Sequence, residues 1–139
     1  MNEQNFAFWI ARLRKALRRE FEVRAAPLEI TASQLQVLAR LWTGDGILTS
    51  VLTKDIASDG GTITGVLDRL ERKGLIRRER HEADRRAMRI WLTPAGRALE
   101  QPLLDIIAAI NDKALAGLEA EQKSQLLQVL KQVGENLDA

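Results

Sequence analysis

The stretch TITGVLDRLERKGLIRRERHEADRRAMRIWLTPAG, residues 62–96, decides the fold of this 139-residue chain. Its first part predicts a helix over residues 62–73, because apolar side chains recur at three- and four-residue spacing along one face. These side chains are Ile63, Val66, Leu67 and Leu70. Gly74 is expected to end the helix, since glycine readily adopts the left-handed conformation that follows a last helical turn.

The second part of the stretch predicts a β-hairpin over residues 75–92. Apolar Met88, Ile90 and Leu92 alternate with Arg89 and Trp91, which is the two-residue period of a strand. The residues HEAD at 81–84 form the expected tip. Thr93 followed by Pro94 is typical of a helix start, and the helix after it is predicted to reach about residue 117.

Four further helices are predicted from apolar spacing and helix-start signals. They cover residues 5–24, 31–43, 50–57 and 119–137. Thr31 and Gln34 have the spacing of a capping box, and Thr49 is positioned to cap the short helix at 50–57. The predicted fold class is therefore mainly α with a small β-hairpin wing. Within a single subunit, a winged helix-turn-helix core at about 31–93 is flanked by N- and C-terminal helices.

Composition excludes several classes of function. The chain contains no Cys and a single His, His81, so a thiol redox sensor and a multi-histidine metal site are not expected. His81 is predicted to be an exposed loop residue. No nucleophile–base pair or phosphate-binding glycine loop indicates an enzyme, and no cofactor is predicted. No apolar run approaches the ~20 residues of a membrane span and no secretory signal is recognised, so the expected location is cytoplasmic.

Charge is unevenly distributed along the chain, although the net charge is only +2. Residues 69–97 carry 10 basic and 4 acidic side chains, whereas residues 98–139 carry 3 basic and 7 acidic ones. A concentrated positive segment attracts polyanions. A solvated charged surface is the alternative, but the place of this segment on a helix and a hairpin favours DNA.

The face of the 62–73 helix opposite its apolar side chains is predicted to read DNA. Such a helix matches the width of the major groove, and a basic hairpin beside it can reach the backbone or the minor groove. The residues predicted to contact DNA are Thr62, Thr64, Gly65, Arg69 and Arg72 on the helix and Arg78, Arg85 and Arg86 on the hairpin. Some hairpin arginines are instead expected to pair with Glu79, Glu82 or Asp84.

Two blocks of this stretch resemble the MarR (multiple antibiotic resistance regulator) family of bacterial transcription factors. They are TITGVLDRLERKGLIRR at 62–78 and ADRRAMRIWLTPAG at 83–96, which are similar to the family's DRLE, KGL, D-x-R and LTxxG pattern. The resemblance implies a homodimer that binds a pseudo-palindromic operator in double-stranded DNA, with one 62–73 helix of each subunit in a major groove. It also implies that Asp84 braces the wing, and that small aromatic or anionic effectors bind.

The terminal helices, 5–24 and 94–137, are predicted to form the dimer interface. Each carries an apolar stripe, and a chain of this length offers few internal partners for both. The residues predicted to pair between subunits are Phe6, Ile10, Leu126, Leu130, Val133 and Leu137. Trp9, Arg12 and Trp42 are predicted to line an effector pocket between the terminal helices and the DNA-binding module, with an ordinary core as the alternative.

Gly60, Gly61 and Gly65 depart from the family's pattern around the start of the 62–73 helix. Close backbone approach to phosphate and weak base readout are the two interpretations, so the operator sequence stays open. The leading hypothesis is a dimeric, sequence-specific DNA-binding transcriptional regulator, specifically a repressor relieved by a small-molecule effector. The alternative is a winged-helix protein-interaction module with only non-specific DNA binding.

Overall fold

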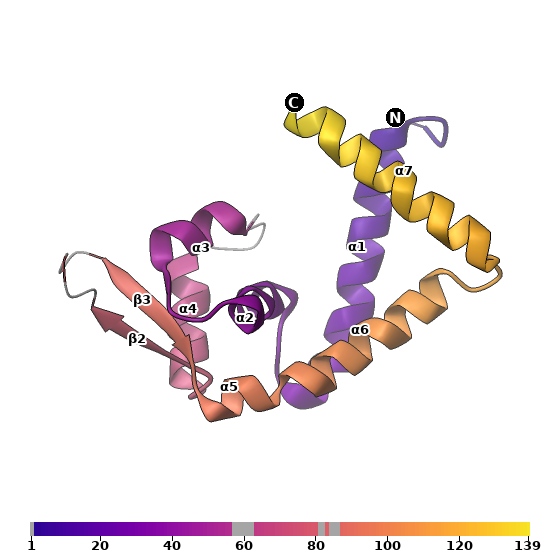
Figure 1. Cartoon of the computed structure of the whole chain (residues 1–139). Helices are drawn as coiled ribbons and strands as arrows, with labels where there is room; N and C mark the ends of the chain where they lie inside the picture. The colour runs from indigo at the N-terminus through magenta and orange to yellow at the C-terminus, as the bar shows by residue number, and fades with distance from the viewer. Residues whose placement is uncertain (1, 57–62, 81–82, 84–86) are drawn as a thin grey trace. The chain divides into compact units, whose positions relative to one another are not determined.

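The computed structural model describes residues 2–56, 63–80, 83 and 87–139. Figure 1 shows a mostly helical chain with one small antiparallel sheet, which confirms the predicted fold class. The elements in order are α1 (Phe6–Ala25), the 3-10 turn η1 (Ala26–Leu28), α2 (Ala32–Thr43), β1 (Ile47–Leu48), α3 (Thr49–Asp55), α4 (Ile63–Arg72), β2 (Ile76–Arg80), β3 (Met88–Leu92), α5 (Pro94–Ala98), α6 (Glu100–Ala114) and α7 (Ala120–Asp138). The chain divides into two compact units, Met1–Ile107 and Ala108–Ala139.

The sheet has three strands in the order β1-β3-β2, one more than the predicted hairpin. Strand β1 pairs antiparallel with β3, with Ile47 opposite Ile90 and Leu48 opposite Arg89. Two residues are too few to show the alternation that marks a strand in the sequence. The partner that β1 needs also lies some forty residues further along the chain, so only folding reveals the pairing.

The core of the first unit lies between the helices α2, α3 and α4 and the sheet (Figure 1). The predicted apolar face of α4 is fully confirmed, because all four of its stripe residues are buried. On α2, Val37, Leu38 and Leu41 are buried, whereas Leu35 and Trp42 are half-buried. The largest fully buried side chains are Leu38, Leu41, Leu52, Leu67, Leu70, Ile76, Ile90, Leu103 and Val37.

The capping box predicted at the start of α2 is confirmed. The backbone N–H of Gln34 donates to Oγ1 of Thr31 at 3.2 Å, and the N–H of Thr31 donates to Oε1 of Gln34 at 3.1 Å. The predicted cap at Thr49 is wrong, because Thr49 is the first residue of α3 itself. Its hydroxyl donates instead to the carbonyl of Met88 at 3.3 Å, which ties α3 to β3.

The single helix predicted from residue 94 to about 117 is wrong. The structure has two helices, α5 and α6, which are separated at Leu99, and α6 ends at Ala114. Pro102 in the first turn of α6 explains the break. Proline has no N–H, so it cannot donate to the carbonyl of Ala98 as a continuous helix requires.

The second unit consists of the end of α6 and the whole of α7. Glu119 and Gln122 form a capping box at the start of α7, with the N–H of Glu119 donating to Oε1 of Gln122 at 2.8 Å. All of α7 is described, and none of its residues is buried. Among the described residues, no helix combines the length and the apolar character that a membrane crossing requires.

Candidate nucleic-acid interface

Helix α4 presents outward the face that the sequence predicts for DNA. Its apolar side is buried, whereas Thr64, Arg69 and Arg72 are exposed and Gly65 is half-exposed. Thr62, like Gly60 and Gly61, lies outside the described residues. The structure thus confirms the helix and its outward face, and contact between these side chains and DNA stays a prediction.

The end of α4 has the geometry that Gly74 predicts. Gly74 has a φ of +74°, and its N–H donates to the carbonyl of Glu71 at 2.9 Å. The N–H of Leu75 donates to the carbonyl of Leu70 at 3.0 Å. These two bonds form a Schellman motif, which satisfies carbonyl groups that the helix end leaves free.

Lys73 attaches the end of α4 to the start of α2. Its ammonium group donates to the carbonyl oxygen of Glu29 and to Oε1 of Gln34, the latter at 3.1 Å. The amide oxygen of Gln34 therefore accepts two hydrogen bonds, one from Lys73 after α4 and one from the N–H of Thr31 at the start of α2. Glu29 and Gln34 lie 44 and 39 residues from Lys73 along the chain, so a local sequence pattern does not show these contacts.

Arg78 joins the wing to α4. From β2, its Nη2 lies 2.7 Å from Oδ1 of Asp68 and 2.9 Å from Oε1 of Glu71. Its Nε and its backbone N–H both reach Oε2 of Glu71, at 3.3 and 3.2 Å. The side chain of Arg78 is 24% exposed. Two carboxylates on α4 therefore hold an arginine that the sequence assigned to DNA, and DNA contact by Arg78 stays a prediction.

The same contacts shift the ionisation of the groups involved. The hydrogen bond from the Arg78 side chain lowers the pKa of Glu71 below its ordinary value, against a smaller opposing effect of burial. The hydrogen bond to Glu71 likewise raises the pKa of Arg78. Both shifts favour the charged forms of Glu71 and Arg78. The cluster formed by Arg78, Asp68 and Glu71 is here called the α4 brace.

The wing is formed by β2 and β3, which pair from Ile76–Leu92 to Arg80–Met88. Arg77 lies 2.7 Å from Glu79, which confirms the expected pairing of a wing arginine with this residue, and its guanidinium is 5.4 Å from the centre of the Trp91 ring. The tip residues His81, Glu82, Asp84, Arg85 and Arg86 lie outside the described residues. Bracing by Asp84 and DNA contact by Arg85 and Arg86 therefore stay predictions.

A cavity of about 460 Å³ lies between α3, α4 and the wing. Polar groups from Thr49, Ser50, Thr64 and Arg78 line it, together with apolar groups from Leu48, Leu67, Ala87 and Met88. Its volume falls in the range of small-molecule sites. None of the residues predicted to form the effector pocket lines this cavity.

Two of the three residues of the predicted effector pocket, Trp9 and Arg12, contact each other, whereas the indole of Trp42 contacts α5. The guanidinium of Arg12 lies 5.7 Å from the centre of the Trp9 ring, and the Trp9 indole donates to the carbonyl of Glu3 at 2.7 Å. The indole of Trp42 donates to the carbonyl of Gly96 at 3.4 Å. A pocket shared by Trp9, Arg12 and Trp42 stays a prediction.

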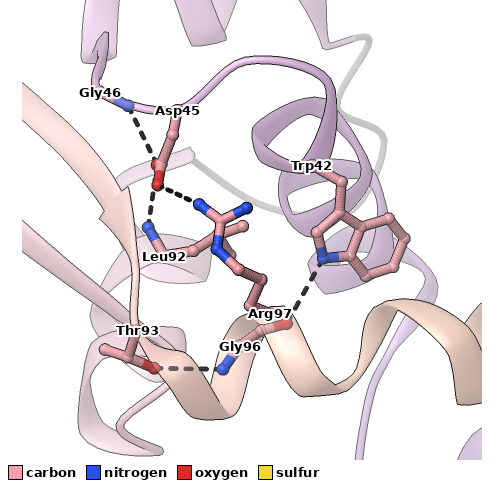
Figure 2. Close-up of polar contacts among 7 residues, drawn as sticks. All are labelled: Trp42, Asp45, Gly46, Leu92, Thr93, Gly96 and Arg97. Carbon is pink, nitrogen blue, oxygen red and sulfur yellow. Dashed lines mark hydrogen bonds and ion pairs between the residues drawn. The ribbon is translucent and has the colours of Figure 1, made fainter.

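The start of α5 is held from several sides, as Figure 2 shows. Thr93 caps the helix by accepting the N–H of Gly96 at 3.1 Å, and its hydroxyl donates to the carbonyl of Gly74 at 2.6 Å. A Cβ at Gly96 would collide with the carbonyl oxygen of Leu75. Glycine at this position therefore lets α5 lie against the turn that ends α4.

The residues predicted to form a dimer interface are solvent-exposed in the single chain. Phe6 and Ile10 on α1 are 54% and 39% exposed. On α7, Leu126, Leu130 and Leu137 are 36%, 43% and 77% exposed, and Val133 is half-buried. Within the described part of the chain, no cluster of three or more carboxylate or histidine side chains is arranged to hold a metal ion.

Comparison with known proteins identifies a family that shares this sequence and fold. The model of the MarR family matches residues 30–88. The organic hydroperoxide resistance transcriptional regulator of Bacillus subtilis (strain 168) is 30% identical over 108 residues, which are 78% of this chain and 74% of that protein. The crystal structure of wild-type MarR (apo form) from E. coli has a TM-score of 0.80 and 27% identity, covering 93% of this chain and 96% of that one. Reduced AbfR, solved bound to DNA, shares the fold with a TM-score of 0.73 at 23% identity, over 96% of this chain and 91% of its own.

Proposed function

This chain belongs to the MarR family, whose members are transcriptional regulators and not enzymes, and we propose that it acts as a dimeric, sequence-specific DNA-binding repressor relieved by a small-molecule effector. The similarity to the organic hydroperoxide resistance transcriptional regulator of Bacillus subtilis supports the regulatory part of this proposal. A repressor of transcription acts on the chromosome, so the proposal also locates the protein in the cytoplasm.

The main support for the proposal is that α4 exposes a polar face beside a wing rich in arginine. Helix α4 has 10 residues and is thus ~15 Å long, and it exposes Thr64, Arg69 and Arg72. Arginine can bond to guanine through two parallel hydrogen bonds, and threonine can bond to a base edge or a phosphate. The α4 brace and the Lys73 contacts attach this helix to β2 and α2 and so help to position its exposed face.

The exposed apolar residues of α1 and α7 support the dimer. Leucine and phenylalanine side chains gain about 1.5–3 kcal/mol each when they leave water, so a stripe of them favours a second copy of the chain. A two-fold symmetric dimer would present two α4 helices, which explains a pseudo-palindromic operator.

The cavity beside α4 supports relief by an effector. Arg78 lines this cavity while it pairs with Asp68 and Glu71. An anionic molecule in the cavity would compete with these carboxylates for the guanidinium and loosen the wing from α4. Such a ligand would favour conformations that no longer match the operator, and so shift the population away from DNA binding.

A fluorescence-anisotropy titration tests the proposal. The purified protein is titrated against duplex DNA from upstream of its own gene and against a scrambled duplex of equal length, at low and near-physiological salt. We expect a preference of ~10³-fold or more for the native DNA, as specific binders typically show.

Matched variants separate base recognition from general attraction between charges. Arg72→Ala on α4 is expected to weaken operator binding by about 10-fold, in the range of one lost arginine contact. Arg19→Ala removes the same charge from α1 and is expected to change affinity little. Equal losses in both variants, or equal binding to every sequence in a random pool, would favour the protein-interaction module instead.

A further inference from the structure

One ion pair connects the winged-helix module to the helix that leads out of it. Asp45 lies in the loop after α2, and its Oδ2 is 2.8 Å from Nη2 of Arg97 on α5. Its other oxygen, Oδ1, accepts the N–H of Gly46 at 3.0 Å and the N–H of Leu92 at 2.9 Å. Figure 2 shows the carboxylate between the three donors. A single side chain therefore joins a loop, the end of β3 and helix α5.

The loop that carries Asp45 has little freedom to move. Gly46 has a φ of +68° and lies against the Trp91 ring, where a Cβ would collide with the ring atoms. The carbonyl of Gly46 accepts a hydrogen bond from Arg89 at 2.7 Å, and its N–H donates to the carbonyl of Ile90 at 3.0 Å. Asp45 itself is 20% exposed, against 55% for Arg97. The Asp45 carboxylate is therefore held in place by its loop, and the side chain of Arg97 reaches it from α5.

From this geometry we propose that Asp45 and Arg97 are positioning residues whose ion pair orients α5 on the winged-helix module and thereby sets the half-site spacing that the dimer accepts. The inference rests on the proposed function. The module carries α4, and α5 continues after Leu99 into α6, where Leu103 is buried. A change in the angle at α5 therefore moves α4 relative to the start of α6, and α6 leads to the C-terminal helix proposed to pair between subunits.

The distance between the two half-sites is a sensitive measure of that angle. One inserted base pair rotates one half-site about 34° around the DNA axis, since a helical turn contains about 10.5 base pairs. The contact between the winged-helix module and α5 that Asp45 and Arg97 make is here called the joint. A dimer in which the joint is rigid would lose much of its affinity for such an operator, whereas a dimer with a loose joint would adapt to the new spacing.

Two substitutions break the ion pair in different ways. Asp45→Asn keeps an oxygen to accept from Gly46 and Leu92, but replaces Oδ2 with an amide donor that faces Arg97. Arg97→Gln leaves Asp45 and its backbone partners intact. The matched control is Arg40→Gln, because Arg40 pairs with Asp55 at 2.8 Å inside the module and does not reach α5.

The experiment compares binding to the native operator with binding to operators that have one base pair added or removed between the half-sites. For the wild type and Arg40→Gln we expect a loss of about 10-fold or more on changing the spacing. For Asp45→Asn and Arg97→Gln we expect the loss to shrink to about 3-fold or less. Unchanged losses in both joint variants would overturn the inference while leaving the proposed function intact. A wild type without any preferred DNA sequence would overturn the proposed function, and this inference with it.

A second measurement tests the joint without DNA. The chain has no cysteine, so Lys54→Cys on the exposed surface of α3 provides a single labelling site in each subunit. We expect the distribution of distances between the two spin labels in the dimer to broaden when Asp45→Asn or Arg97→Gln is added, at temperatures where all variants are folded. Distributions as narrow as that of the wild type would contradict a positioning role, even if thermal stability fell.

Discussion

Helices α4 and α7 both carry apolar residues at helical spacing, but these side chains are buried on α4 and largely exposed on α7. The four stripe residues of α4 are at most 9% exposed, whereas Leu126, Leu130 and Leu137 on α7 are 36% to 77% exposed. The difference teaches that an apolar stripe shows that a helix needs a partner, but not whether the partner belongs to the same chain.

The two helices also differ in what holds their ends and polar faces. Helix α4 ends in a Schellman motif and is connected to α2 by Lys73 and to β2 by Arg78. The polar interactions of α7 include its own capping box and the contact of Gln132 with Asn136, both within the helix or its cap. Long-range contacts thus fix the orientation of α4, which agrees with a role in presenting side chains to DNA.

The largest expected effect is on the exposed stripe of α7. Leu130→Asp is expected to weaken dimerisation by 10²-fold or more, because a symmetric interface contains the residue twice and burial of each leucine gains about 1.5–3 kcal/mol. Sedimentation velocity over a range of concentrations measures the effect. The control is Gln128→Asp, which adds the same charge on the other side of the helix. A Leu130→Asp protein that dimerises like the wild type would exclude this stripe from the interface.

The next effect is on the covered stripe of α4. Leu70→Ala is expected to lower the free energy of unfolding by about 3 kcal/mol, because Leu70 is fully buried and a cavity remains after truncation. Urea denaturation measures the loss, with dimerisation followed separately. Thr64→Ala, on the exposed side of the same helix, is the control and is expected to change stability by less than about 0.5 kcal/mol. Similar losses for both variants would contradict the contrast between the two faces.

A smaller effect is expected from the α4 brace. Arg78→Ala is expected to lower the free energy of unfolding by about 1 kcal/mol, because two partly exposed ion pairs are lost and two carboxylates are left close together. Thermal unfolding measures this change, and the anisotropy titration should show weaker operator binding as well. Arg77→Ala removes a neighbouring pair whose members are both more than half exposed, so its loss should be smaller. An equal or larger loss in Arg77→Ala would argue against the brace.

The smallest effect is a pH dependence from Glu71. Its pKa is lower in the folded chain than its ordinary value of 4.5, so its stabilising effect is present above about pH 4.5 and is lost as the pH falls through the lowered pKa. Glu71→Gln removes this titration. The difference in Tm between the wild type and Glu71→Gln is therefore expected to be largest near pH 6 and to narrow towards pH 3. A difference that stays constant over this range would show that Glu71 does not titrate with folding.

Local signals in the sequence predicted most of the helical framework and the wing strand β3. The capping box at Thr31, the end of α4 at Gly74 and the buried side of α4 were all readable, because each depends on residues within one or two helical turns. The same kind of signal failed at Thr49 and across Pro102. At Thr49 the hydroxyl bonds to the carbonyl of Met88 on β3, which local spacing does not show. The break before Pro102 has a local cause, because proline has no N–H, although the apolar spacing continues across it.

The sequence by itself determined which segments are helices, which of their faces are apolar, and where positive charge is concentrated. Only the tertiary structure decided that Arg78 pairs with Asp68 and Glu71, that β1 joins β3, and that Asp45 holds both Leu92 and Arg97. The physical reason is that the partners lie on different elements, which meet only when the chain packs. Spacing along a helix or strand is set by backbone geometry, whereas Asp45 meets Leu92 and Arg97 across 47 and 52 residues, and the chain has to pack before these groups meet.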